Sequence, residues 1–227
     1  RDDPAFAYWV KRAGKRRTIS FGEHLDADVR LLAFTSTGQG SDFSLSLPDG
    51  NIAVSWPMLG RHMALNAAAA AATAWLAGAS APDIANGLGA MQPEPGRMQP
   101  VESKHGGALI HDAYNANPVS FEAAIDVMAD IGGETLLIAG DMAELGAESL
   151  AHHRAVGQYA IGKIGQLWSA GEQASAMSAA FGGRHFKSVV ELLAELPATI
   201  NHNTAILVKG SRSSGMDRVI DALRGKS

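Results

Sequence analysis

Three polar clusters in the second half of the sequence contain side chains that can bind charged ligands. Residues 111–118, 140–146 and 209–215 each follow a short run of apolar residues. Such runs are typical of strands in a parallel sheet, where ligands collect beyond the carboxyl ends of the strands. The sequence therefore predicts a binding site built from loops that follow strands.

The first cluster combines a carboxylate, a phenol and two amides on Asp112, Tyr114, Asn115 and Asn117. These groups can hold a polar ligand through hydrogen bonds. The alternative is structural, because Asn117 is a suitable N-cap for a helix that begins at Pro118, and the other residues would then form a polar loop.

The second cluster places Asp141 and Glu144 after an apolar strand. Two carboxylates in this place can bind a metal ion, accept hydrogen bonds from an ammonium group or cap a helix, and the sequence leaves these alternatives open. Two histidines follow at the start of a helix. His152 lies four residues before Val156 and is expected on the same inward face, with His153 turned about 100° away.

The third cluster contains Lys209, Ser211 and Arg212, just before the last expected helix. Cations, hydroxyls and backbone N–H groups at a helix N-terminus form an anion site. Ser213 or Ser214 can cap the helix, but a cap does not explain two cations beside the positive end of a helix dipole. We therefore expect an anionic ligand here.

The elements that position these clusters alternate between strands and helices. This order predicts a mostly parallel sheet covered on both faces, and therefore an α/β fold. Apolar runs and helical periodicity predict a β-pair within 98–112, strands at 135–139, 166–169 and 204–208, a short strand near 185, and helices at 118–130, 149–163, 172–181, 189–195 and 214–224.

The first half of the chain has a different pattern and is separated by a linker. Gln92–Gly96 contains two prolines and one glycine, which excludes a regular element and places a domain boundary between residues 1–94 and 95–227. Before it we expect a helix at 5–13, strands at 15–21 and 26–35, a hairpin with strands at 43–47 and 52–54, an alanine-rich helix at 67–76 and a helix at 82–88.

Composition excludes several classes of protein. The 227 residues contain 19 Lys and Arg against 23 Asp and Glu, and no cysteine, so disulfides and thiolate ligands are absent. The small net charge of −4 does not favour a nucleic-acid or anionic-membrane surface. No apolar run is long enough to span a bilayer, so we expect no membrane insertion. The chain begins at Arg1, as if inside a longer protein.

Two nucleotide-binding motifs are missing. No G-x-G-x-x-G sequence opens a strand–helix unit, which disfavours an NAD-dependent enzyme. Gly157–Lys163 has the spacing of a phosphate loop but is followed by Ile164 and falls within an expected helix, so we interpret it as chance.

Five motifs, in order along the chain, resemble those of the Mur ligase family. They are Gly60-Arg61-His62 with Asn66, Pro95-Gly96-Arg97, Asp112-x-Tyr-Asn-Ala-Asn-Pro118, Gly140-Asp-Met-x-Glu-Leu-Gly146 and Val208-Lys-Gly-Ser-Arg-Ser213. The resemblance implies that residues 1–94 are the back half of a middle, ATP-binding domain and that 95–227 are a complete Rossmann-like C-terminal domain. The family's Gly-Lys-Thr/Ser loop would then lie upstream.

The resemblance also implies an activity, which is ATP-dependent amide formation in cytoplasmic peptidoglycan biosynthesis. In the member that the motifs resemble, the carboxylate of UDP-MurNAc-tripeptide becomes an acyl phosphate, which the amine of D-Ala-D-Ala attacks. It implies ATP and Mg²⁺, the main Mg²⁺ ligands lying upstream, and we expect a monomer that is inactive as this piece alone. The alternative is a stand-alone nucleotide- or peptide-binding module without catalysis.

The same resemblance assigns roles to individual residues. Met63 departs from it, because the family often has Asn there. For the nucleotide, the resemblance implies that His62 and Asn66 contact adenine, that Arg97 contacts phosphate after domain closure, and that Asp112 contacts ribose. It places Tyr114, Asn115 and Asn117 on the nucleotide and dipeptide side of the cleft. It assigns the dipeptide ammonium to Asp141 and Glu144, and the charge of the carboxylate or acyl phosphate to Lys209, Ser211 and Arg212.

Overall fold

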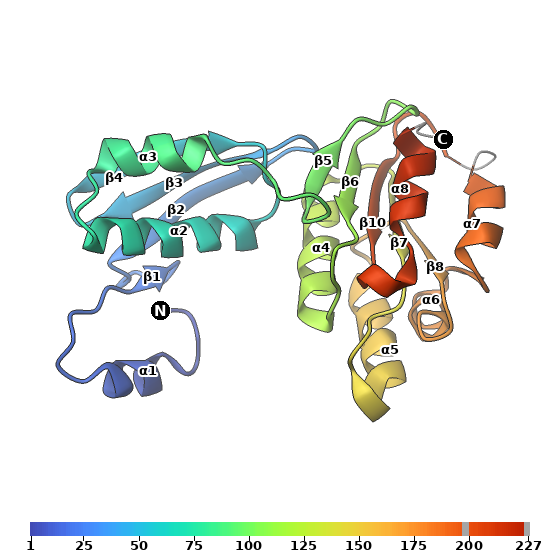
Figure 1. Cartoon of the computed structure of the whole chain (residues 1–227), viewed down its shortest axis with the longest axis horizontal. Helices are drawn as coiled ribbons and strands as arrows, with labels where there is room; N and C mark the ends of the chain where they lie inside the picture. Colours follow the sequence, from blue (N-terminus) through green and yellow to red (C-terminus); the bar gives the residue numbers. More distant parts are fainter. Residues whose placement is uncertain (197–199, 225–227) are drawn as a thin grey trace. The chain divides into compact units, whose positions relative to one another are not determined.

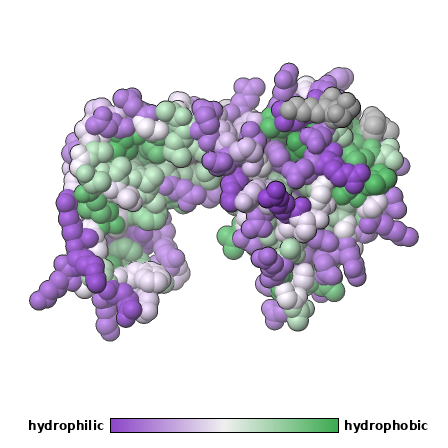
Figure 2. Space-filling view, viewed as in Figure 1, coloured by the Kyte–Doolittle hydropathy of each residue, from purple (hydrophilic) through white to green (hydrophobic). Residues whose placement is uncertain are grey.

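A computed structural model describes residues 1–196 and 200–224. The chain divides into two compact units, each with its own sheet (Figure 1). Unit 1 comprises Arg1–Ser36, Gly40–Pro57 and Arg61–Gln92, and unit 2 comprises Thr37–Gln39, Met58–Gly60 and Pro93–Ser227. Figure 2 shows both hydrophilic and hydrophobic residues on the visible surface of each unit. No helix within the described residues is long and apolar enough to cross a membrane.

Unit 1 is built on a four-stranded sheet with the strand order β1-β2-β3-β4. β1 pairs in parallel with β2, and the other pairs are antiparallel. The predicted hairpin forms, with alternate residues of β3 and β4 buried. The expected strand at 15–21 is wrong except at its end, since three cations at 15–17 leave no apolar face to bury. The strands are β1 Phe21–Gly22, β2 Val29–Ser36, β3 Ser41–Leu47 and β4 Gly50–Trp56.

The helices of unit 1 are α1 (Phe6–Ala13), α2 (Arg61–Leu76) and α3 (Ala81–Gly89). α2 and α3 pack on the sheet, and five alanines of α2 are buried against it. α2 starts six residues before the expected alanine run, so the motif at 60–66 forms its first turns. α3 begins at a capping box made by Ser80 and Asp83.

Unit 2 confirms the predicted α/β fold with a six-stranded sheet in the order β5-β6-β10-β7-β8-β9. All neighbours are parallel except β5 and β6. The last strand, β10, lies between the two strands that precede the other polar clusters. The strands are β5 Gln99–Val101, β6 Leu109–Asp112, β7 Thr135–Ala139, β8 Gln166–Ala170, β9 Arg184–Phe186 and β10 Ala205–Lys209.

Helices cover both faces of this sheet, as predicted (Figure 1). Alternate residues of β10 contribute to two cores, Leu207 to one and Ile206 and Val208 to the other. The first core includes α4 (Pro118–Ile131), α5 (Ser149–Ala160) and α6 (Ser175–Phe181), and the second includes α7 (Val189–Glu195) and α8 (Asp217–Arg224).

Three expected helices of unit 2 are shorter than predicted. α5 ends at Ala160, and α6 begins only at Ser175. The last helix is interrupted by Gly215 at φ 71°, which separates a short 3₁₀ turn at Arg212–Ser214 from α8. Gly157 lies inside α5, where a Cβ would fall 2.1 Å from the carbonyl oxygen of Met177, so this glycine serves helix packing.

Candidate functional site

The three polar clusters lie side by side at the carboxyl edge of the unit 2 sheet. β10 brings them together, because Lys209 at its end pairs in register with Asp112 of β6 and with Ala139 of β7. The sequence predicted that each cluster follows a strand, but not that the third cluster lies between the other two. The geometry therefore defines one candidate site.

A buried ion pair lies at the centre of this edge. Nζ of Lys209 donates to Oδ2 of Asp112 at 2.6 Å and to the carbonyl oxygen of Asn115 at 3.2 Å. The two side chains are only 2% and 11% exposed, and the Phe121 ring centroid is 5.4 Å from the ammonium. The ammonium of Lys209 is therefore engaged inside the protein instead of facing the surface of the site.

The carboxylate of Asp112 is also held from its other side. Its Oδ1 accepts a hydrogen bond from the backbone N–H of Met98 at 3.0 Å. Burial raises the pKa of Asp112, and the Lys209 ammonium and the Met98 N–H oppose this effect. Asp112 thus connects the strand end to the segment that follows the linker, a contact that no sequence pattern indicated.

Arg97 and Tyr114 form the exposed part of the same segment. The guanidinium carbon of Arg97 lies 4.5 Å from the centroid of the Tyr114 ring, and the N–H of Tyr114 donates to the carbonyl of Gly96 at 3.1 Å. Gly96 and Met98 both have positive φ, at 74° and 47°. This local backbone, held by the two hydrogen bonds, presents a cation and an aromatic ring at the site's surface.

The amides of the first cluster serve local structure. Asn117 caps α4, with its Oδ1 accepting from the N–H of Ser120 at 2.8 Å in a capping box. Oδ1 of Asn115 accepts from the N–H of Ala116 at 2.8 Å. The structural alternative for Asn117 therefore holds, while both asparagines remain exposed at the site.

The second cluster contains one carboxylate bonded to a backbone N–H and one exposed carboxylate. Oδ1 of Asp141 accepts from the N–H of Ala174, just before α6, at 2.7 Å. This contact links the loop after β7 to the start of α6. Glu144 is exposed and has φ 64°, an uncommon value for a residue other than glycine.

The expectation for the two histidines is wrong. His153 is fully buried, whereas His152 is half-buried and lies 3.9 Å from Glu148. The inward stripe of α5 repeats at three- and four-residue intervals from His153, so His152 lies one position outside it. The buried members of the stripe are His153, Val156, Gly157 and Ala160.

The third cluster packs against the second. Oγ of Ser211 accepts from the N–H of Ala143 at 2.8 Å, and the N–H of Ser211 donates to the carbonyl of Asp141 at 3.0 Å. Ser211 is buried and Arg212 is exposed. The last helix does not start at this cluster, because a 3₁₀ turn occupies Arg212–Ser214 and α8 begins only at Asp217.

His62 and Asn66 belong to unit 1, in the first turns of α2. His62 is half-buried, and Asn66 is exposed with its Nδ2 3.7 Å from Sδ of Met63. The neighbouring Arg61 donates from Nε to Glu23 at 2.8 Å. Because His62 and Asn66 are four residues apart, they lie on one side of the helix.

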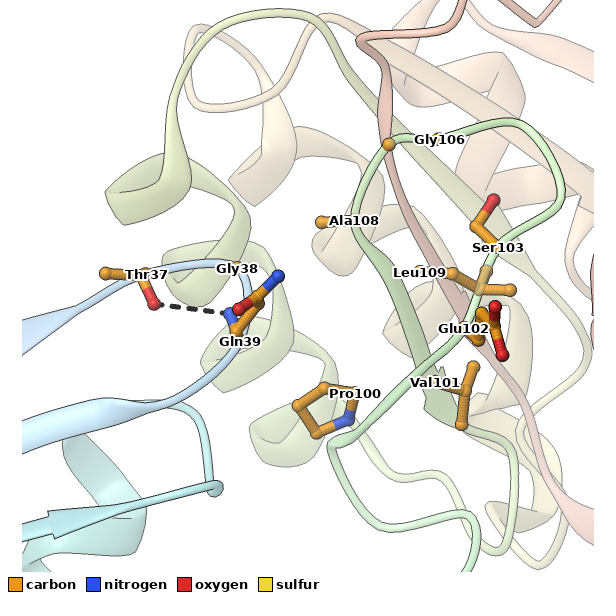
Figure 3. A pocket seen from close by; sticks show the side chains of 11 residues that line it. Thr37, Gly38, Gln39, Pro100, Val101, Glu102, Ser103, Gly106, Ala108 and Leu109 are labelled. Atoms are coloured by element: carbon orange, nitrogen blue, oxygen red, sulfur yellow. Dashed lines mark hydrogen bonds between the residues drawn. The ribbon is translucent and has the colours of Figure 1, made fainter.

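The geometry of the described residues bears on two other kinds of site, one for a metal ion and one for a small ligand. Across residues 1–196 and 200–224, no group of three His, Asp or Glu side chains could hold a metal ion. A cavity of about 820 Å³ in unit 2 is lined by Thr37–Gln39, Pro100–Ser103 and Gly106–Leu109 (Figure 3). It borders the amino end of β6, and none of the predicted site residues lines it.

The two-part organisation and the motif-bearing edge match a known family of ligases. Residues 96–212 match the model described as Mur ligase, glutamate ligase domain, and residues 1–74 match the Mur ligase middle domain. The chain belongs to the Mur ligase family.

Two similar proteins from different bacteria carry the same name. The chain is 38% identical over 228 residues to UDP-N-acetylmuramoyl-tripeptide–D-alanyl-D-alanine ligase of Escherichia coli, covering 98% of this chain and 50% of the relative. The namesake from Bacillus subtilis is 26% identical over 94% of this chain and 49% of its own length. The chain therefore spans about half the length of the curated relatives it matches.

Solved structures of MurF have the same fold as this chain. A crystal structure of MurF from Acinetobacter baumannii superposes with a TM-score of 0.89 at 30% identity, covering 100% of this chain and 51% of that one. MurF from Thermotoga maritima in complex with ADP has a TM-score of 0.84 at 21% identity, covering 99% and 52%, which supports the fold alone.

Proposed function

We propose that this chain is the part of a MurF-type ligase that joins D-alanyl-D-alanine to UDP-MurNAc-tripeptide. The observation that carries the proposal is the meeting of three family motifs at one sheet edge, where β10 places Lys209 beside Asp112 and Ala139. Parallel sheets bind ligands at this edge. The names of the relatives supply the substrates.

The proposed reaction consumes ATP. The γ-phosphoryl group passes to the terminal carboxylate of the tripeptide, and the amine of D-Ala-D-Ala then attacks the acyl carbon, loses a proton and displaces phosphate. The protein has little covalent chemistry to perform, so positioning and charge neutralisation supply most of the rate.

The exposed side chains of unit 2 are the ones that we assign to ligands. Arg97 and Tyr114 offer a cation and a ring to the nucleotide, with Asn115 nearby. Glu144 offers a carboxylate to the dipeptide ammonium, and Arg212 offers charge to a carboxylate or acyl phosphate. Contact with adenine is assigned to His62 and Asn66 of unit 1.

The buried side chains support this surface. Lys209 holds Asp112 and the backbone of Asn115, so we assign it a positioning role in place of direct contact with the acyl phosphate. Asp112, whose two oxygens are held by Lys209 and the N–H of Met98, is assigned the same positioning role in place of the expected contact with ribose. Asp141, Ser211 and Asn117 shape the loops that face the substrate.

The described residues suit a nucleotide only in part. Arg97 and Tyr114 fit its charge and aromatic base, but the described chain contains no cluster that could hold Mg²⁺. We propose that Mg²⁺ ligands and the phosphate loop come from outside these 227 residues. The enzyme is proposed to be a cytoplasmic monomer.

A hybrid ligase tests the proposal. It joins this chain to the part of the Escherichia coli relative that the chain does not cover, and phosphate release is measured with ATP, UDP-MurNAc-tripeptide and D-Ala-D-Ala. We expect release that requires both acceptor substrates, and none from the 227-residue chain alone. A folded hybrid that binds ADP or D-Ala-D-Ala but releases no phosphate would indicate a binding module and refute the proposal.

A further inference from the structure

We infer that His153 is a positioning residue that fixes the Asp141–Glu144 loop through the backbone of Met142. The inference rests on the proposed function, because it assigns this loop to binding of the dipeptide. It concerns a buried group whose part in the site no sequence motif indicated.

The hydrogen bonds of His153 determine the state of its ring. The backbone N–H of Met142 lies 2.9 Å from Nε2 of His153 and can only donate, so Nε2 accepts. Nδ1 lies 2.8 Å from the carbonyl oxygen of Ser149, which can only accept, so Nδ1 carries the proton. The imidazole is therefore neutral, in one tautomer, with both nitrogens engaged.

His153 is suited to hold the loop rigidly because it is itself fixed. Its side chain is completely buried on the inward face of α5, and its Nδ1–H bonds to the preceding turn of the same helix. The Met142 side chain, 2% exposed, is anchored in the core beneath the loop. The contact thus ties the loop after β7 to a helix and not to another loop.

The neighbouring residues of the loop are held from other directions. The N–H of Ala143 donates to Oγ of Ser211, and the carboxylate of Asp141 accepts from the N–H of Ala174. Fixing two successive N–H groups leaves Glu144 at φ 64°, exposed at the sheet edge. An uncommon backbone conformation persists only where its surroundings determine it. His153 supplies one of these restraints.

A purely structural histidine would behave differently from a positioning one. Packing alone could be provided by an apolar residue, which would leave the buried N–H of Met142 without an acceptor. Loss of packing lowers stability and affects all ligands alike. Loss of the Met142 contact should instead loosen one loop and weaken one substrate.

Two substitutions separate these roles. The side-chain oxygen of His153→Gln reaches the position of Nε2 and can still accept from Met142. His153→Asn is shorter, so its amide can replace the Nδ1–H contact with Ser149 but not the acceptor for the loop. His152→Asn, on the half-buried neighbouring position, is the matched control.

Amide hydrogen exchange of the 227-residue chain gives the first readout. We expect His153→Asn to speed exchange of the Met142 amide by about tenfold, the loss of about one hydrogen bond, while His153→Gln and His152→Asn leave it within about twofold of the parent. A long-range ¹H–¹⁵N spectrum should show Nδ1 protonated and Nε2 unprotonated. Unchanged Met142 exchange in the folded Asn variant would overturn the inference.

The hybrid ligase gives the second readout. We expect His153→Asn to raise KM for D-Ala-D-Ala by about tenfold, to leave KM for ATP within about twofold, and to be rescued by Gln. Equal losses toward both substrates, or a Gln variant no better than Asn, would show a merely structural role. A folded parent hybrid that binds ADP or D-Ala-D-Ala but releases no phosphate would refute the proposed function, whereas the Met142 exchange tests the His153 contact separately.

Discussion

Removing the ammonium of Lys209 should leave the buried carboxylate of Asp112 without its counter-ion. In Lys209→Met a side chain of similar length replaces it, and the buried carboxylate of Asp112 keeps its hydrogen bond from the N–H of Met98 but loses its ion pair. Breaking a buried ion pair from one side costs about 3–5 kcal/mol. That loss is a large share of the roughly 5–15 kcal/mol that stabilises a typical domain.

A second substitution tests the cause of this loss. Asp112→Asn removes the charge but keeps an oxygen that can accept from Met98. Replacing both members of a buried pair is often close to neutral, so the double variant should recover to within about 1 kcal/mol of the parent. The coupling between the two positions should then be at least about 2 kcal/mol.

Hydrogen exchange at the central strand measures the effect in unit 2 alone. Three of the four tryptophans, Trp9, Trp56 and Trp75, belong to unit 1, so fluorescence would report mainly on the other unit. We expect the amides of Ile206–Val208 to exchange about 150- to 5000-fold faster in Lys209→Met, the equivalent of about 3–5 kcal/mol.

The pH dependence of this loss has a defined sign. In Lys209→Met the native carboxyl of Asp112 has a pKa raised by burial, so the folded state binds a proton more tightly than the unfolded state. Stability of the variant should therefore increase as the pH falls through that raised pKa. A loss below about 1 kcal/mol, or additive losses in the double variant, would refute the account of a buried coupled pair.

Three further predictions concern other contacts. Arg97→Ala in the hybrid ligase should raise KM for ATP at least about fivefold. It should change the free energy of unfolding by less than about 0.5 kcal/mol, because the contact of Arg97 with the Tyr114 ring is exposed. A KM for ATP equal to that of the parent would contradict the nucleotide role. Asn117→Ala should cost about 1 kcal/mol by loss of the α4 cap, measured by urea unfolding against Val119→Ala as an exposed control. Burial raises the pKa of Asp2, but hydrogen bonds from the N–H groups of Glu23 and His24 outweigh this effect, so the net pKa is lowered. The two amides should therefore be protected from hydrogen exchange above the ordinary carboxyl pKa, and the protection should be lost as the pH falls through the lowered value. Protection that does not depend on pH would contradict this prediction.

The local elements of unit 2 could be predicted where one short-range signal dominated. The strand Thr135–Ala139 is buried at every position, and the helix Val189–Glu195 begins at the Ser188 cap, so both were predicted with the observed bounds. The last helix was placed too early because Gly215 was read as part of it. Its left-handed backbone conformation ends the 3₁₀ turn instead.

The candidate site was predictable in its membership but not in its connections. Lys209 and Asp112 are separated by 97 residues, and their contact follows from the insertion of β10 between β6 and β7. No local pattern encodes that strand order. The error at His152 and His153 has a different origin, because at the start of a helix a single apolar reference residue does not distinguish between neighbouring positions.

The contacts at the sheet edge separate two kinds of polar residue that the sequence presents as one set. The first kind forms its hydrogen bonds within the protein, either with other members of the set or with backbone groups. Its members are Lys209, Asp112, Asp141, Ser211 and His153. The second kind is exposed at the same edge and consists of Arg97, Tyr114, Asn115, Glu144 and Arg212. A ligand can gain charge and hydrogen bonds only from groups that are accessible to it, so the second set is the one expected to contact substrates. The first set fixes the positions of the second set. Substitutions in the first set should therefore change stability and loop order together with substrate affinity.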